Sequence, residues 1–338
     1  MKEMINIFSS AHVLVTGGTG SIGSELVRQL IELNPKNIRV VSNDENGLFE
    51  LSQELSKQEI VDFYYGDVRD FERMKEVCIG VDYVFHAAAL KHVDICEYNP
   101  FEALKTNELG TQNVITASLQ SNIKKLITIS TDKAVDPTTT LGATKLLAEK
   151  MTIDANNYTG NNKSYLSCVR FGNVIASRGS VMPIFKQQIE TGGPVTVTDK
   201  RMTRFFLSLE DSVQLVLEAM KVMKGREIFI LKSPSAVRIN DLAKVMIESL
   251  SPRRKIAIKY IGRRLNEKMH ENLMSEEEMV NAFQNESMYI IPQYNLNDSQ
   301  KRSYGEALEK VVSQHSSDQV SQLSKDEIKM FLKKYNIV

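Results

Sequence analysis

Two kinds of hydrophobic pattern alternate along the first half of the chain. Short apolar runs rich in Val, Ile and aromatic residues predict strands at residues 12–17, 38–43, 61–67, 81–89, 124–131 and 164–173. Longer segments with helical spacing lie between them, as at 24–33 and 110–121. This alternation predicts a doubly wound α/β fold with a parallel sheet, which binds its ligands at the carboxyl ends of the strands.

The pattern changes after residue 175. Shorter strands are expected at 193–199, 227–232 and 254–261, and helices at 208–223 and 239–250. We expect an N-terminal domain at 1–175, a smaller α/β substrate-binding lobe at 176–295 and a C-terminal extension at 296–338, with later segments returning to the first domain. The polar segment 297–322 is either an ordered surface extension or partly mobile, and 324–335 predicts a capped terminal helix.

Composition narrows the kinds of partner. Hydrophobic residues make up 42% and charged residues 25% of the 338 residues, which are ordinary values for a soluble protein. The 42 basic residues balance 42 acidic ones, so the chain lacks the net charge that attracts nucleic acid or anionic lipid. We expect small molecules or other subunits as partners, and neither nucleic acid nor a membrane.

Cysteine usage and the chain start bear on the compartment. Cys78, Cys96 and Cys168 are widely spaced without ligand-like spacing, which predicts neither a disulfide framework nor a zinc site, and no other metal site is expected. The first ten residues contain no apolar run of signal-peptide length, and no later stretch approaches membrane-spanning length. The sequence therefore predicts a cytoplasmic protein.

A glycine-rich turn joins the first predicted strand to the first helix. Gly17, Gly20 and Gly23 have GxxGxxG spacing there. Glycine is needed because a side chain would hold the backbone away from a pyrophosphate, whose charge is met by the amides and dipole of the helix start. The sequence therefore predicts a dinucleotide site. The expected contacts are Gly17, Thr19, Gly20, Ser21, Ile22 and Gly23.

The end of the second predicted strand bears on the choice between NAD and NADP. An acid there would bind the ribose diol of NAD, but Ser42 and Asn43 occupy the tip and Asp44 follows. A small polar pair leaves room for a 2′-phosphate and favours NADP, whereas the lack of an arginine in this loop favours NAD. We expect NADP, with NAD as the alternative.

Two further strand ends face the cofactor in such a fold. We expect His86 to be a packed strand-end residue and not a catalyst. The alanines that follow it are small enough to lie beside the cofactor, although packing of the strand end would also explain them. The residues expected at these ends are Asp67 and Val68, near the adenine, and Ala87, Ala88 and Ala89.

Several motifs together resemble the extended short-chain dehydrogenase/reductases. More narrowly, they resemble the nucleotide-sugar 4,6-dehydratases that act on UDP-N-acetylglucosamine in surface-polysaccharide biosynthesis. Ordinary sugar epimerases of this superfamily lack the "STDKA" element. The resemblance implies an enzyme that forms a UDP-4-keto-6-deoxy sugar as a homo-oligomer. The motifs are "TGGTGSIG", "GDVRD", "HAAALKHVDICEYNP", "KTNELGTQNV", "STDKAVDPTTTLGATK", "VRFGNVIASRGSVMPIF" and "VTVTDKRMTRFF".

The reaction that this resemblance implies has three steps: oxidation at C4, loss of water across C5 and C6, and return of hydride to C6. The resemblance makes Asp132 the acid for the leaving 6-hydroxyl and Lys133 the C5 base, with Thr131 beside them. Lys145 would hold the nicotinamide ribose. Because Lys133 must be neutral to act as a base, we expect burial and the charge of Lys145 to lower its pKa.

Leu141 departs from the family pattern. The 5-epimerising branch has tyrosine here as its proton acceptor and another branch has methionine, yet no tyrosine occurs between residues 131 and 150. We expect Asp132 to act twice instead, first taking the 4-hydroxyl proton and then giving it to the 6-hydroxyl. On local sequence alone, "TDK" is equally compatible with a solvated turn capped by Thr131.

Substrate contacts are expected around the smaller lobe. Asn173 can both donate and accept hydrogen bonds, and the turn at 179–183 would bring the backbone amides of Val181 and Met182 to the nucleotide. Arg204 is the candidate diphosphate clamp because a planar guanidinium matches pairs of phosphate oxygens. The resemblance implies further contacts, near the sugar from Lys91 and near the uridine diphosphate from Glu267, His270 and Glu271, with Asn266 where the family more often has glycine.

Three alternatives remain beside an inverting dehydratase. An apolar residue at 141 favours a retaining dehydratase, whereas the chain length and C-terminal segment favour the 5-epimerising branch. A 4-epimerase needs neither a C5 base nor a leaving-group acid, so the Asp-Lys pair disfavours it. A catalytically silent, cofactor-binding sensor is supported by Leu141 and disfavoured by the presence of Asp132, Lys133 and Lys145.

Overall fold

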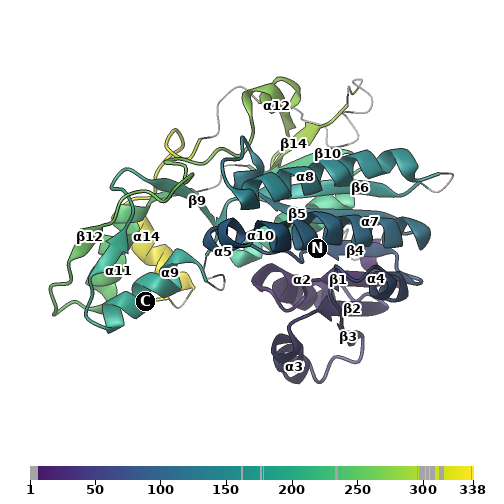
Figure 1. Ribbon diagram of the computed structural model, residues 1–338, viewed down its shortest axis with the longest axis horizontal. Helices are drawn as coiled ribbons and strands as arrows, with labels where there is room; N and C mark the ends of the chain where they lie inside the picture. Colours follow the sequence, from purple (N-terminus) through teal and green to yellow (C-terminus); the bar gives the residue numbers. More distant parts are fainter. Residues whose placement is uncertain are drawn as a thin grey trace.

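One large sheet dominates the molecule. The computed structural model describes residues 7–160, 163–175, 177, 179–232, 235–294, 296, 301, 304, 309–311, 316–335 and 337–338. In this part of the chain, ten strands form one sheet in the order β15-β13-β14-β10-β6-β5-β4-β1-β2-β3 (Figure 1). Neighbours from β3 to β10 are parallel, and β14, β13 and β15 continue the sheet antiparallel. The strands are β1 His12–Thr16, β2 Asn37–Ser42, β3 Val61–Tyr65, β4 Tyr83–His86, β5 Lys125–Thr131, β6 Tyr165–Phe171, β10 Glu227–Leu231, β13 Phe283–Gln284, β14 Met288–Pro292 and β15 Glu309–Lys310.

Helices cover both faces of this sheet. Alternate residues of β1 point to opposite cores: Val13 and Val15 pack with α2, α3 and α10, whereas Leu14 packs with α4 and α7. This arrangement confirms the predicted doubly wound α/β fold, and all six strands predicted in the first half are present. The helices of this part are α2 Ser21–Glu32, α3 Glu45–Glu54, α4 Phe71–Cys78, α5 Val93–Tyr98, α6 Pro100–Leu104, α7 Gly110–Gln120, α8 Thr140–Asp154 and α10 Leu209–Val222, with a π-helical turn at Lys105–Leu109 and 3-10 turns at Asp132–Ala134 and Ala155–Tyr158.

A smaller lobe lies beside the carboxyl ends of the strands and has its own core (Figure 1). A three-stranded sheet in the order β11-β9-β7 and the pair β12-β8 carry it. No strand is predicted over β9 because all five of its residues are buried, which removes the alternation that marks a half-exposed strand. The elements are β7 Asn173–Val174, β8 Val195–Val197, β9 Thr203–Leu207, β11 Ser235–Arg238, β12 Ile258–Tyr260, α9 Val181–Glu190, α11 Ile239–Leu250 and α14 Lys325–Lys334. The short helix α12 Glu276–Asn281 packs against β14 of the large sheet instead.

The C-terminal extension contributes to both parts. β15 adds to the edge of the large sheet, and α14 packs on α11 in the smaller lobe. Ser324 and Glu327 form the capping box that the sequence predicts at the start of α14. Much of the polar segment 297–322 lies outside the described residues. The division into three domains stays a prediction, although β10 and β14 show that later segments lie within the large sheet.

Candidate active site

The turn between β1 and α2 comes so close to its neighbours that side chains are excluded. Gly17 has a positive φ of 66°, and a Cβ on it would lie 2.6 Å from Cα of Ala88. A Cβ on Gly23 would lie 2.2 Å from the carbonyl oxygen of Gly17. Gly20 is the N-cap of α2, and in the described structure no side chain caps this helix. The turn and the helix start therefore form a cradle that fits a dinucleotide pyrophosphate.

The tip of β2 lies beside a loop that carries an arginine. The buried Ser42 hydroxyl is 2.7 Å from that of Thr19 in the glycine turn. Asn43 donates to Asp67 at 3.1 Å, and Arg69 pairs with the same carboxylate at 2.6 Å. Burial opposes ionisation of Asp67, but Arg69 and Asn43 hold the pKa of this carboxyl below its usual value. The loop after β2 has no arginine, yet the loop after β3 supplies one because the carboxyl ends of parallel strands meet.

His86 braces the end of β4 from within the core. Its Nδ1 is 2.7 Å from Oγ1 of Thr16, and its Nε2 is 2.9 Å from Oγ1 of Thr111. Because Thr111 donates its proton to the carbonyl of Asn107, it accepts from Nε2–H, and Nδ1 accepts from Thr16. Burial lowers the pKa of His86 to about 3, so the ring is neutral. The residue is the packed strand-end histidine that the sequence predicts.

Asn107 was not predicted as a site residue. It lies on the π-helical turn and is completely buried. Its side chain accepts from the amide of Leu90 at 2.8 Å and donates to the hydroxyl of Thr144 at 3.0 Å. It thereby ties the loop after β4 to α8. A polar residue in an otherwise helical stretch is too common a signal to have revealed this role.

The Asp-Lys pair stands at the carboxyl end of β5. Thr131 ends the strand, and its hydroxyl caps the following 3-10 turn by accepting from the amide of Lys133. Oδ1 of the completely buried Asp132 accepts from the Thr131 hydroxyl at 2.9 Å and from Nζ of Lys133 at 2.8 Å. Nζ also donates to Oδ1 of Asn173 at 3.2 Å. Side-chain hydrogen bonds therefore hold the turn, and they place the amine of Lys133 against the buried carboxylate of Asp132.

α8 carries the other two positions that the sequence singles out. Lys145 is 6% exposed, and its Nζ donates to the carbonyl of Ile129 at 2.6 Å. Burial lowers the pKa of this lysine. Leu141, one turn earlier, is buried in a small apolar cluster with Cys96 and Ala103. Position 141 thus contributes packing and offers no group that could carry a proton.

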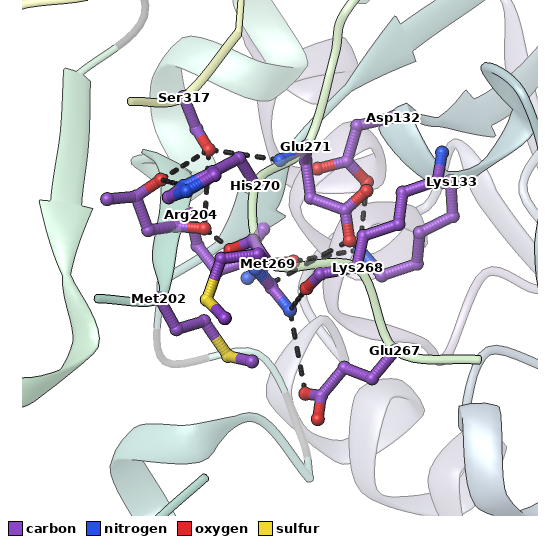
Figure 2. Close-up of polar contacts among 12 residues, drawn as sticks. Asp132, Lys133, Met202, Arg204, Glu267, Lys268, Met269, His270, Glu271 and Ser317 are labelled. Atoms are coloured by element: carbon purple, nitrogen blue, oxygen red, sulfur yellow. Dashed lines mark hydrogen bonds and ion pairs between the residues drawn. The ribbon is translucent and has the colours of Figure 1, made fainter. Parts of the chain in front are cut away.

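Four charges of alternating sign meet at this turn: Lys133, whose side chain is 20% exposed, and the buried Asp132, Arg204 and Glu271 (Figure 2). Oε1 of Glu271 lies 3.9 Å from Nζ of Lys133 and 3.8 Å from Nε of Arg204. Burial and Arg204 favour a neutral Lys133, but Asp132 and Glu271 outweigh them and raise the pKa of Lys133 above its ordinary value. This direction differs from the expected lowering, because two carboxylates adjoin the amine. The cation that lowers the pKa of Lys133 is Arg204, whereas the sequence had pointed to Lys145.

The segment that follows β12 forms one wall of this site. Arg264 pairs with Asp94 of α5 at 2.9 Å, and the carbonyl of Asn266 accepts from the Thr138 hydroxyl at 2.7 Å. Asn266 has a φ of 63°, which asparagine tolerates and glycine adopts more readily. The hollow enclosed in this way is lined by Val93, Asp94, Glu97, Lys133, Thr138, Thr139, Asn173, Arg204, Arg264, Leu265, Asn266, Glu267, Lys268 and Glu271.

Two predicted site residues of this segment, Glu267 and His270, point to different sides of it. Glu267 lines the hollow, with Oε1 3.5 Å from Nη2 of Arg204. His270 points to the opposite side, where Nδ1 is 2.7 Å from the Thr203 hydroxyl and the ring lines a different hollow (Figure 2). Glu271, and not His270, therefore faces Lys133. Substrate binding by His270 stays a prediction.

The remaining predicted residues are spread around the cleft. Val181 opens α9, but the Met182 side chain is 2% exposed within the smaller-lobe core, so only its backbone could reach a ligand. Lys91 is exposed and does not line the hollow. Val68 is buried with its side chain against Gly110, and the amide of Ala87 donates to the carbonyl of Thr16.

The arrangement brings an anion cradle and a proton-transfer site to the same edge of the sheet. Asp132, Lys133 and Asn173 can exchange protons and hydrogen bonds with a hydroxylated substrate. The Nη groups of Arg204 donate to the carbonyls of Thr203, Lys268 and Met269, and anion binding by this residue stays a prediction. In the described part of the chain, no group of His, Cys, Asp and Glu residues is placed to hold a metal ion. Fold and site therefore define a dinucleotide-binding protein of the doubly wound α/β class with a second lobe over the ligand face.

Comparison with known proteins places the chain within that class. The chain belongs to the family described as "Polysaccharide biosynthesis protein", which matches residues 13–293. A UDP-N-acetylglucosamine 4,6-dehydratase (inverting) of Campylobacter jejuni is 44% identical over 287 residues, which are 84% of each chain. A UDP-glucose 4-epimerase of Rickettsia canadensis is 39% identical over 98% of each chain, and an uncharacterized membrane protein of Methanocaldococcus jannaschii is 50% identical over 98% of each.

A solved structure supports the fold over nearly the whole length. The X-ray structure of Pen from Bacillus thuringiensis is 39% identical, has a TM-score of 0.90, and is matched over 97% of this chain and 98% of that one. None of the helices in the part of the chain described here has the length and apolar character that a membrane span requires.

Proposed function

We propose that this protein catalyses the NADP-dependent 4,6-dehydration of UDP-N-acetylglucosamine to a UDP-4-keto-6-deoxy sugar with inversion at C5. The observation that carries the proposal is the Asp132-Lys133 pair: Lys133 lines one hollow with Asn173 and Arg204, and its amine bonds to the buried carboxylate of Asp132. Elimination of water needs both an acid and a base, and this pair supplies both. The name of the 44% identical relative supports the substrate and the stereochemistry.

The chain's own groups supply the proton transfers up to the loss of water, and C5 then regains a solvent-derived proton on the opposite face when hydride reaches C6. When bound, the nicotinamide would accept hydride from C4 and return it to C6. Asp132 takes the proton of the 4-hydroxyl and later gives it to the departing 6-hydroxyl. Lys133 takes the C5 proton, which the neighbouring carbonyl has made acidic. Arg204 binds the diphosphate, and Lys145 would hold the nicotinamide ribose.

NADP is the proposed cofactor because of the groups around the tip of β2. Ser42 and Asn43 leave room for a 2′-phosphate. Arg69 forms an ion pair with the carboxylate of Asp67, which Asn43 also contacts. An arginine beside that position would offset the charge of the phosphate. Mass spectrometry of the nucleotide released from the denatured protein tests this, and NAD in place of NADP would contradict it.

Incubation with UDP-N-acetylglucosamine in deuterated water, followed by NMR of the product, tests the reaction. We expect a 4-keto-6-deoxy sugar that carries deuterium at C5 in the inverted configuration. Asp132→Asn and Lys133→Ala should each lower kcat by about 100-fold or more, the range for loss of a general acid or base. Leu141→Met, a volume-conserving change outside the proton-transfer groups, should keep the turnover of the parent. Parent-like rates in both site variants would refute the proposal.

A 4-epimerase is the second candidate, favoured by the 39% identical relatives of that name. Epimerisation returns hydride to C4 and leaves the C5–H and C6–O bonds intact. It therefore gives no role to an acid and a base placed as Asp132 and Lys133 are. A UDP-sugar product with the 6-hydroxyl retained and no deuterium at C5 would establish the epimerase instead.

A further inference from the structure

The proposed dehydration leaves one proton without a destination. Nζ of Lys133 is 2.8 Å from Asp132, and the two neighbouring carboxylates raise the pKa of this lysine, so it enters the reaction as an ammonium ion. A base must first lose that proton. Asp132 is already needed for the 4-hydroxyl proton, and Leu141 carries no exchangeable proton. A further acceptor within reach of Lys133 is required.

Glu271 stands at that place. Its Oε1 is 3.9 Å from Nζ of Lys133, its side chain is 4% exposed, and both residues line the same hollow. Among the described residues, Oε2 of Glu271 is buried and lacks a hydrogen-bond partner. Burial, reinforced by Asp132, raises the pKa of this carboxyl. A buried carboxylate with a free oxygen favours gaining a proton over staying charged.

The backbone of Glu271 is fixed by the C-terminal extension. Its amide donates to the hydroxyl of Ser317 at 3.0 Å, and its carbonyl accepts from the Ser317 amide at 2.8 Å. Ser317 is completely buried. The extension therefore holds the carboxyl at the inner end of the hollow, and a flexible surface residue could not keep this position.

Arg204 links Glu271 to substrate binding. Its Nε is 3.8 Å from Oε1 of Glu271, so in the free protein this arginine helps to keep the carboxylate ionised. A diphosphate that binds Arg204 competes for that positive charge. Lys268 adds a weaker attraction. Once the diphosphate is bound, Glu271 therefore becomes a better proton acceptor while Lys133 faces the sugar.

We propose that Glu271 accepts the Nζ proton of Lys133 after the diphosphate binds, and so converts Lys133 into the C5 base. One N–H bond of the ammonium breaks, one O–H bond forms on Glu271, and the neutral amine then takes the C5 proton. Glu271 acts through Lys133 and is a positioning residue rather than a group that contacts the reacting carbon. This inference rests on the proposed function.

Glu271→Gln tests the proposal because it keeps the shape and removes the acceptor. We expect kcat to fall by about 100-fold or more near neutral pH. C4 oxidation, seen as transient absorbance of reduced nicotinamide, should continue, while deuterium exchange at C5 should stop. Activity should return at alkaline pH, where solvent hydroxide can deprotonate Lys133. Glu271→Asp, which keeps a carboxyl, should recover part of the rate at neutral pH.

Two other outcomes would overturn the proposal. Loss of the Glu271 charge also lowers the pKa of Lys133. A higher rate with a pH profile shifted to lower pH would therefore show that Glu271 only raises this pKa and accepts no proton. Equal loss of C4 oxidation and C5 exchange would indicate a structural role. A parent protein that forms no dehydrated product would instead refute the proposed function itself.

Glu267→Gln is the matched control on the same segment. Glu267 contacts Arg204 at 3.5 Å and is not among the groups that shift the pKa of Lys133. We expect a lower KM, because the amide no longer competes with the diphosphate for Arg204, with C5 exchange and C4 oxidation still in the parental ratio. A selective loss of C5 exchange in this variant as well would contradict a specific role of Glu271.

Discussion

Arg170 is the charged side chain whose loss should be most damaging. It lies on β6, is 1% exposed, and forms two-pronged ion pairs with Glu149 of α8 and Glu278 of α12. A fifth bond goes to the carbonyl of Leu273 at 3.0 Å. The cluster therefore joins the helix that carries Lys145 to the segment that follows Glu271.

Arg170→Met should destabilise the protein by about 3–5 kcal/mol, because it leaves the carboxylate of Glu149, 1% exposed, buried without a cation. Glu278 contributes less because its side chain is 17% exposed and can be hydrated. The double variant Arg170→Met/Glu149→Gln should recover much of the loss, since it removes the stranded charge.

Arg28→Met is the matched control. Arg28 also pairs through two nitrogens with a glutamate, Glu54, but the side chains are 38% and 48% exposed. The expected cost is about 0–1 kcal/mol, because water screens the pair and replaces its hydrogen bonds.

Urea denaturation, followed by far-UV circular dichroism because the chain has no tryptophan, measures these differences. All samples should contain the same cofactor concentration, since bound ligand adds stability. Burial raises the pKa of Glu278, but the ion pair with Arg170 outweighs burial and lowers it. The stabilisation that this ion pair contributes is therefore present above about pH 4.3 and is lost as the pH falls through the lowered pKa. The gap between parent and Arg170→Met should narrow there. Equal losses for Arg170→Met and Arg28→Met at neutral pH would refute the reasoning.

Two further predictions concern the cofactor turn and the core. Gly23→Ala should abolish retention of nucleotide on purification, because its Cβ would lie 2.2 Å from the carbonyl oxygen of Gly17. A parental nucleotide content in this variant would contradict the cradle. Burial lowers the pKa of His86 to about 3, so unfolding binds a proton and the free energy of unfolding should decrease from about pH 6.5 towards pH 3. His86→Gln should show a shallower pH dependence in urea titrations, and an unchanged slope would show that His86 does not contribute it.

Local patterns were sufficient for the first half of the fold. Apolar runs separated by helical spacing predicted β1 to β6, since buried parallel strands need continuous hydrophobic residues. β9 escaped prediction because its sequence, "TRFFL", mixes buried polar and apolar residues whose burial depends on the second lobe. The capping box of α14 was predictable because it involves only neighbours in the chain.

The site divides in the same way. The glycine turn and the Asp132-Lys133 pair could be identified from sequence because each lies within one short segment. Only the tertiary structure decided which distant groups set their charge: Arg204 and Glu271 come from the second lobe and meet at Lys133.

What the sequence determined by itself is therefore the set of elements and the chemistry available within each segment. Only the tertiary structure decided the protonation states of these side chains. The pKa of Lys133 is raised because two carboxylates, one adjacent in sequence and one 138 positions away, outweigh burial at a single amine. Electrostatic interaction depends on separation in space and on local dielectric, and neither quantity is encoded in any one stretch of the chain.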